Sequence, residues 1–140
     1  MKILAPVDGS SYTKRMLAYL AAHEEWMDQH HQYTMLNVQP AIPGRAISVI
    51  DKATLKAYYE SEAEKVFKPI RSFFKRQTMP LEFMAKVGHA ATTIAQVAEK
   101  GRFDLIVLGS HGQGSMMNLV MGSVATKVIA GCKVPVLLIR

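Results

Sequence analysis

Three glycines and a serine in the C-terminal third of the chain have a spacing suited to binding phosphate. Gly109 and Gly112 follow an apolar run, and nine residues further on Gly122 and Ser123 open a helical pattern. Glycine lets backbone N–H groups approach a ligand closely, and a helix start adds unpaired N–H donors and a positive dipole end. This arrangement favours an anion site, to which Ser123 adds a hydroxyl donor. Gly122 is also a candidate for a positive φ.

A purely structural interpretation stays open at this point: the glycines turn the chain and Ser123 caps a helix. Known phosphate motifs do not decide the question. The chain has no G-x-x-x-x-G-K-[ST] loop, and Met117 stands where the dinucleotide fingerprint needs its third glycine. After Gly109 the only charged residues are Lys127, Lys133 and Arg140, so no carboxylate repels a polyanion there.

A second candidate group is Asp8, which follows the apolar run Lys2–Val7 and precedes Gly9. Its carboxylate could accept hydrogen bonds from ribose hydroxyls or from the amino group of adenine, or it could cap the turn that follows. The glycine motif downstream favours the ligand contact.

Other chemistry is less well supported. His23, His30 and His31 do not have the i, i+3 or i, i+4 spacing of a helical metal pair. Cys132 has no second cysteine to pair with, and we interpret it as a packing residue. No G-x-S-x-G elbow and no catalytic base is evident, and Gly88 stands where a receiver domain needs its phosphate-accepting aspartate.

Strand and helix patterns alternate, and they place these groups at strand ends. The expected strands are Lys2–Val7, Tyr33–Val38, Leu81–Val87, Leu105–Leu108 and Val134–Ile139. The four expected helices run from Ser10 or Ser11 to about Asp28, over Lys52–Arg76 with Pro69 inside, over Ala90–Lys100, and over Gly122–Ala130. Such alternation predicts a doubly wound α/β domain with a parallel sheet, which binds ligands beyond the carboxyl ends of its strands.

Residue patterns refine this picture. Alternation in Leu81–Val87 predicts an edge strand, and the apolar Leu105–Leu108 predicts a central one. Gln39–Val49 and Gln113–Met121 are expected to be the least ordered segments without ligand. Residues 65–76 carry five basic side chains and no acid. We expect the phenylalanines there to face the core; a docking patch for an acidic partner is the alternative.

The composition bounds the class of protein. The chain has 140 residues, 49% of them hydrophobic and 20% charged, which fits one folded domain over residues 1–140. No apolar run approaches the ~20 residues of a membrane span, and the net charge of +6 is too mild to indicate nucleic acid. A start without a signal peptide and a lone cysteine predict a cytoplasmic protein.

Together the motifs resemble the universal stress protein family, in its ATP-binding branch. The spacing Gly109-x2-Gly112-x9-Gly122-Ser123 is similar to the nucleotide-binding motif of that family. The runs 5–10, 104–112 and 134–139 also resemble its first, fourth and last strands with the turns that follow them. Leu36-Asn37-Val38 resembles the end of its second strand, although the family often has His where Asn37 stands.

The resemblance implies the strand order 3-2-1-4-5 and a set of ligand contacts. Pro6, Val7 and Asp8 would line the adenosine side, and the Val38 backbone would meet the adenine edge. Leu108 and Gly109 would lie under the ribose and phosphates, and the phosphates would be cradled by Gly112, Gly122, Ser123 and Val124. His111 lies where relatives also carry a polar or basic residue.

The function that the resemblance implies is a nucleotide-responsive stress-response switch. ATP would order the loop between Gly112 and Gly122, with Mg²⁺ or Mn²⁺ held through the phosphates, and an unidentified regulatory partner would respond. The resemblance also implies a homodimer through Val134–Ile139. A slow ATPase or phosphotransfer protein, or an interaction module with a vestigial nucleotide site, are the alternatives.

Overall fold

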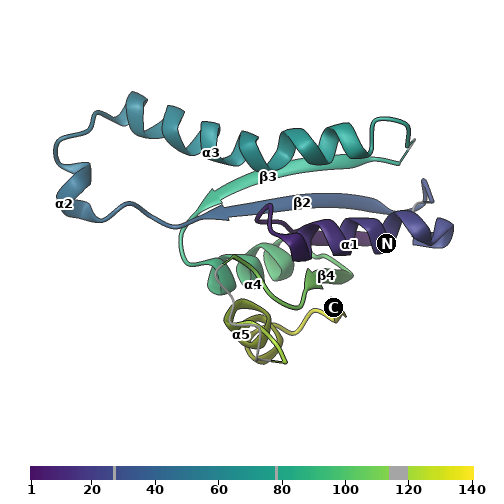
Figure 1. Ribbon diagram of the computed structural model, residues 1–140. Helices are drawn as coiled ribbons and strands as arrows, with labels where there is room; N and C mark the ends of the chain where they lie inside the picture. Colours follow the sequence, from purple (N-terminus) through teal and green to yellow (C-terminus); the bar gives the residue numbers. More distant parts are fainter. Residues whose placement is uncertain (27, 78, 114–119) are drawn as a thin grey trace.

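The computed structural model describes residues 1–26, 28–77, 79–113 and 120–140. Its centre is one parallel sheet with the strand order β3-β2-β1-β4-β5 (Figure 1). The strands are β1 (Lys2–Pro6), β2 (Gln32–Gln39), β3 (Leu81–Val87), β4 (Leu105–Gly109) and β5 (Val136–Ile139). The expected fold class and strand order are therefore confirmed, with β3 and β5 at the two edges.

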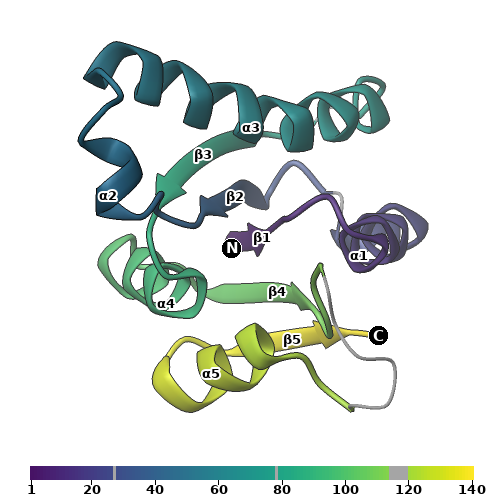
Figure 2. The ribbon, with the colours of Figure 1, turned by 60° about the vertical axis from the view of Figure 1, so that its left-hand side comes forward.

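Helices cover both faces of the sheet (Figure 2). α1 (Ser11–Ala22) and α3 (Lys52–Phe73) pack on one face, and α4 (Ala90–Lys100) and α5 (Ser123–Gly131) pack on the other. Helices are needed on both faces because β4 is apolar on both. Val107 packs in the core under α1 and α3, and its neighbour Ile106, also fully buried, packs in the core under α4 and α5.

The helices differ from the expectation in three places. α1 ends six residues early because His23 turns to an extended conformation, with its N–H donated to the Leu20 carbonyl, and a short 3₁₀ turn, Glu24–Trp26, follows. The expected loop Gln39–Val49 contains α2 (Gly44–Ile47), so the described residues form five α-helices and not four. α3 continues through Pro69 and ends at Phe73.

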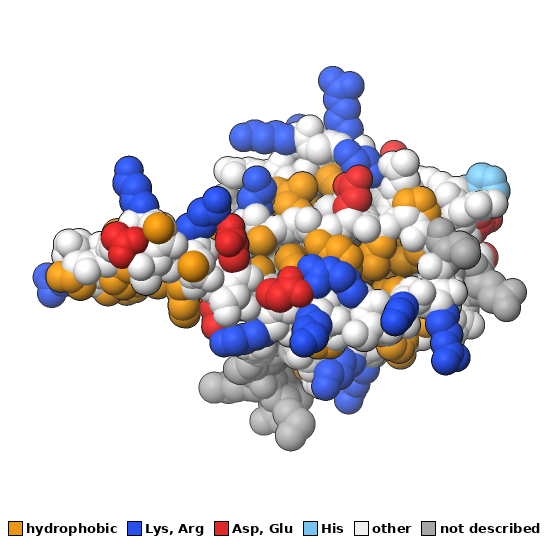
Figure 3. Space-filling view, turned by 90° about the horizontal axis from the view of Figure 1, so that it is seen from above, with side chains coloured by type: hydrophobic (Ala, Val, Ile, Leu, Met, Phe, Trp, Pro, Cys, Tyr) orange, Lys and Arg blue, Asp and Glu red, His pale blue; other side chains and the backbone are white. Residues whose placement is uncertain are grey.

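The basic stretch of α3 is partly neutralised by acids from the preceding turns. Arg71 binds Glu64 through both of its terminal nitrogens, and Lys65 pairs with Glu62. These contacts raise the pKa of the Lys65 ammonium and hold that of the Glu64 carboxyl below its usual value. Figure 3 looks down on this side and shows Lys and Arg side chains scattered among hydrophobic ones. The stretch is thus a mixed surface, not a uniform cationic patch.

The aromatic side chains of this stretch follow the expectation only in part. Phe67 and Phe74 are buried in the core, but Phe73 is 52% exposed and packs edge-on against Phe74. Cys132 is half-buried against the core under α4 and α5, in agreement with its interpretation as a packing residue. In the described ranges, no helix is both long and apolar enough to cross a membrane.

Candidate functional site

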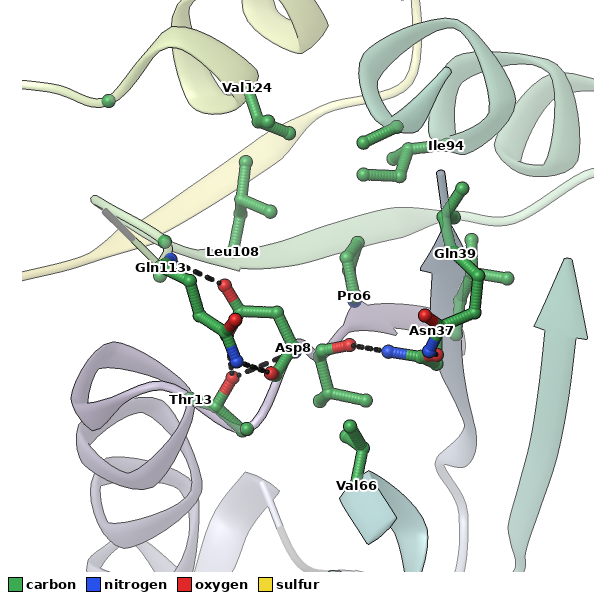
Figure 4. Close-up of a pocket in the computed structure, with 18 of the residues that line it drawn as sticks. Pro6, Asp8, Thr13, Asn37, Gln39, Val66, Ile94, Leu108, Gln113 and Val124 are labelled. Carbon is green, nitrogen blue, oxygen red and sulfur yellow. Dashed lines mark hydrogen bonds between the residues drawn. The ribbon is translucent and has the colours of Figure 1, made fainter. Parts of the chain in front are cut away.

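The described residues enclose a cavity of about 930 Å³ beyond the carboxyl ends of β1, β2 and β4, which is the size of a typical ligand site (Figure 4). All eleven residues expected at a nucleotide site line it. They are Pro6, Val7, Asp8, Val38, Leu108, Gly109, His111, Gly112, Gly122, Ser123 and Val124. The fold therefore brings together three sequence regions spread over more than a hundred positions, because β1 lies between β2 and β4 in the sheet.

Apolar side chains form two opposing walls of the cavity. Ile94 of α4, Leu108 of β4 and Val124 of α5 lie on one side, and Val66 of α3 lies on the other (Figure 4). Pro6 lies between them at the end of β1. Apolar walls with a few polar groups suit a flat, mostly apolar ring that carries a polar edge.

Asp8 connects the turn after β1 to the loop after β4. Its Oδ1 accepts the Ser10 N–H (2.9 Å) and the Thr13 hydroxyl (2.8 Å), and its Oδ2 accepts the Gln113 N–H (3.0 Å). The Gln113 side-chain amide returns a hydrogen bond to the Asp8 carbonyl at 2.7 Å. The structural interpretation of Asp8 as a turn-capping residue is thus correct as far as it goes, but the same carboxylate also lines the cavity.

Two glycines of the motif are required by close packing within the chain. A Cβ at Gly109 would lie 3.1 Å from Tyr12 Cβ and 3.3 Å from the Tyr12 carbonyl, because β4 and α1 come close here. A Cβ at Gly112 would lie 2.7 Å from Asp8 Oδ2, closer than real contacts allow. These two glycines let three backbone segments converge around the cavity.

Gly122 corrects the expectation of a positive φ. Its φ of −73° suits any residue, and the described glycines with positive φ are Gly9 and Gly88. Close approach explains Gly122 instead, because a Cβ there would lie 3.1 Å from His111 Cα and 3.3 Å from the Ser110 carbonyl. The Gly122 N–H also donates to that carbonyl at 2.7 Å, which fixes the start of α5 against the loop after β4.

α5 begins without a side-chain cap. Gly122 is its N-cap residue and offers no side-chain acceptor, and no acidic residue stands in the first turn. α4 likewise begins at the cavity without a side-chain cap, whereas α1 and α3 are capped by the side chains of Ser10 and Asp51. Gly122, Ser123 and Val124 all line the cavity, so the start of α5, where a helix leaves N–H groups without intrahelical partners, borders it. A capless helix start of this kind attracts an anion.

His111 is held at the same end of the cavity. Its Nδ1 lies 3.0 Å from Ser110 Oγ, and its ring stacks on Tyr12 with 4.8 Å between ring centroids. The Arg15 guanidinium lies over the Tyr12 ring, 5.2 Å from the ring centroid. His111 is therefore positioned by neighbours on both the β4 loop and α1.

Sequence reasoning missed several lining residues. Asn37 and Gln39 at the end of β2 gave a weak signal as polar residues beside an apolar strand, and Gln113 lies inside the glycine run itself. The α3 residues Lys65 and Val66 gave none, because only the tertiary fold brings that helix to the cavity.

The interpretation of the histidines as surface groups agrees with their contacts. His30 pairs with Asp28, holding the pKa of that carboxyl below its usual value, and His23 Nδ1 contacts the Tyr19 carbonyl at 2.8 Å. Throughout the described part of the chain, no three His, Cys, Asp or Glu side chains are grouped closely enough to hold a metal ion.

The sequence and the fold are both similar to those of known proteins. Residues 1–140 match the sequence profile of the universal stress protein family. A universal stress protein of Thermus aquaticus is 30% identical over 99% of this chain and 97% of its own length. The solved structure of MJ0577, a universal stress protein of Methanocaldococcus jannaschii, is 26% identical and covers 99% of this chain and 94% of its own, with a TM-score of 0.80.

Two less similar structures share the fold and contain adenine nucleotides. A universal stress protein of Archaeoglobus fulgidus in complex with dAMP has a TM-score of 0.69 at 21% identity, covering 100% of this chain and 98% of its own. An Arabidopsis thaliana family member with AMP bound has a TM-score of 0.71 at 16% identity, covering 99% and 90%. From the match along its whole length and the likeness of its fold, this chain belongs to the universal stress protein family.

Proposed function

We propose that this universal stress protein binds ATP in the cavity and acts in the cytoplasm as a nucleotide-responsive switch of the stress response. The observation that carries the proposal is the uncapped start of α5, which lies with the glycine loop after β4 at a cavity that also has apolar walls. The helix start suits phosphate, and the apolar walls suit a base. The adenine nucleotides held by the Archaeoglobus and Arabidopsis relatives support the same ligand class.

The proposed contacts divide the cavity into an adenosine side and a phosphate side. Pro6, Val7, Asp8 and the Val38 backbone would contact the adenosine, and Leu108 and Gly109 would lie under the ribose and phosphates. The remaining groups would surround the phosphates: His111, Gly112, Gly122, Ser123 and Val124. The three donors on Asp8 leave one of its roughly four acceptor positions for a ribose hydroxyl.

A divalent cation fits this cavity only as a companion of ATP. Among the described lining residues the carboxylates are those of Asp8 and Glu62, and both already bind groups of the chain itself. Mg²⁺ or Mn²⁺ would therefore be held through the phosphates, where it would neutralise part of their charge.

The proposed switch acts through the loop after β4. Asp8 and Gln113 now hold its first residues, and most of the segment from Gly112 to Gly122 lies outside the described residues. The phosphates of ATP would contact this segment and change the surface that the loop presents to a partner protein. An unidentified regulatory partner would respond only if it prefers one of the two states.

We also propose a homodimer through β5. This strand lies at the edge of the sheet, and its half-buried residues Val136, Leu137 and Leu138 are apolar. An apolar edge strand exposes unpaired backbone groups that a second copy can satisfy.

Hydrogen exchange with and without ATP and Mg²⁺ tests the switch. We expect ATP to slow amide exchange at residues 109–113 and in the first turn of α5, while β3 at the far edge keeps its rates. Unchanged exchange at these positions in the presence of saturating ATP would rule out the switch. Phosphate release measured in the same mixtures separates a switch from an enzyme that turns ATP over.

A further inference from the structure

Two side-chain amides lie in series at the end of β2. Asn37 is only 3% exposed, and its Nδ2 donates to the Val7 carbonyl at 2.8 Å. The Asn37 Oδ1 in turn accepts a hydrogen bond from Gln39 Nε2 at 2.5 Å. Both residues line the cavity, on the same side of the strand.

This series fixes the orientation of the Asn37 and Gln39 side-chain amides. The Val7 carbonyl can only accept, so Asn37 must turn its NH₂ toward it and its oxygen toward Gln39. Gln39 must then offer its own NH₂ to that oxygen. The orientation of both amides thus follows from one backbone carbonyl, and Gln39 Oε1 remains as an acceptor beside the second N–H of the same amide.

Gln39 Oε1 is placed to meet a ligand. It accepts no hydrogen bond from any other described residue, and Gln39 is half-buried at the rim of the cavity. Figure 4 shows Gln39 beside Asn37 at the end of β2, and both residues line the cavity. A ligand donor on this oxygen would satisfy the acceptor that the series leaves open.

The position of Gln39 identifies the part of the ligand that it would meet. β2 and β4 flank β1, so two strand spacings, about 10 Å, separate Gln39 from the glycine loop after β4. A neutral carbonyl oxygen repels phosphate but accepts from an amino group. The end of the ligand remote from its phosphates is the base.

We propose that Gln39 is a specificity-determining residue that accepts a hydrogen bond from the exocyclic amino group of the ligand base, with Asn37 as its positioning residue. The proposal rests on the proposed nucleotide binding and deepens it. It assigns recognition of the amino group to a side chain, in addition to the expected contact of the Val38 backbone with the adenine edge.

The size of the effect follows from the value of one neutral hydrogen bond. Such a bond contributes enough to change affinity by roughly 3- to 10-fold. Purine riboside triphosphate is ATP without the 6-amino group, so the ratio of the two affinities reports every contact to that group, and the change in this ratio on replacing Gln39 isolates the Gln39 contact. The wild-type protein should prefer ATP by at least that factor.

The test is calorimetric titration of both nucleotides, with Mg²⁺, into the wild type and three variants. Gln39→Met keeps the length of the side chain and removes the oxygen, and we expect its preference for ATP to fall roughly 3- to 10-fold below that of the wild type. Gln32→Met is the matched control, because Gln32 is an exposed glutamine at the opposite end of the same strand; it should keep the wild-type ratio. Asn37→Ala, which frees the Gln39 amide to rotate, should lower the ratio as well.

The possible failures are distinguishable. If wild type binds ATP but shows no preference, or if Gln39→Met keeps the preference, the role of Gln39 is wrong while nucleotide binding stands. If wild type binds neither nucleotide, the proposed function itself is wrong, and so is the proposed hydrogen bond from the base to Gln39.

Discussion

Replacing Gly122 by valine tests the phosphate end of the cavity. The backbone of Gly122 suits valine, since its φ is −73° and its ψ is 164°. The side chain has no room, however, because its Cβ alone would lie 3.1 Å from His111 Cα and the branched methyl groups reach further. The start of α5 and the loop after β4 must therefore move apart. We expect a loss of stability of about 1–3 kcal/mol, typical of overpacking, with the fold retained.

The effect on ATP binding should be much larger. The N–H groups at the start of α5 would no longer converge with the loop on one phosphate group. Each hydrogen bond to a charged group contributes about 1.5–3 kcal/mol, so the loss of two weakens binding more than about a hundredfold. Calorimetric titration measures the affinity, and circular dichroism checks that the variant is folded.

Gly131→Val is the matched control for this experiment. Gly131 ends the same helix, and a Cβ there would meet no atom within 4 Å. Its ATP affinity should equal that of wild type. A folded Gly122→Val that binds ATP as tightly as Gly131→Val would refute the assignment of Gly122 to the phosphate site.

Three further predictions concern Asp8, the edge strand and Tyr33. Asp8→Ala leaves three donors without their acceptor and should lower the free energy of unfolding, measured by chemical denaturation, by about 1–3 kcal/mol. It should weaken ATP binding less than Gly122→Val does. A greater loss of ATP affinity than in Gly122→Val would contradict the assignment of Asp8 to the adenosine and of Gly122 to the phosphates. Val136→Lys should shift the sedimentation of the protein from dimer to monomer, and a wild type that is already monomeric at micromolar concentration would exclude the dimer. Burial raises the pKa of Tyr33 to about 12 from about 10 in the unfolded chain, so its stabilising contribution is complete below pH ~10 and is lost as pH rises toward 12. Tyr33→Phe should flatten the fall in stability over that range, and an unchanged slope would show that another group causes it.

The periodicity of the chain was enough to predict the sheet. The alternating Leu81–Val87 forms the edge strand β3, and the apolar run at Leu105 forms the buried strand β4. A strand with one exposed face carries polar residues on that face, whereas a strand buried on both faces is apolar throughout. The exact strand order followed from the resemblance, since periodicity does not say which strands are neighbours. The eleven expected lining residues meet because β1 lies between β2 and β4.

Other features depend on contacts that sequence patterns do not carry. The end of α1 at Ala22 depends on the turn of His23, and the need for glycine at position 122 depends on how closely the Ser110 carbonyl approaches. The hydrogen bond from Asn37 to Val7 requires β1 and β2 in one register, and the one from Gln39 to Asn37 requires both side chains on the same side of β2. Such contacts are set by the assembled fold, so local propensity could not predict them.

Native mass spectrometry of the purified protein, with and without ATP and Mg²⁺, tests the central claim most directly. We expect a mass increase of one ATP per chain in wild type and in Gly131→Val, and none in folded Gly122→Val at the same concentration. The absence of an ATP adduct in wild type, or equal occupancy in all three proteins, would contradict nucleotide binding at the start of α5.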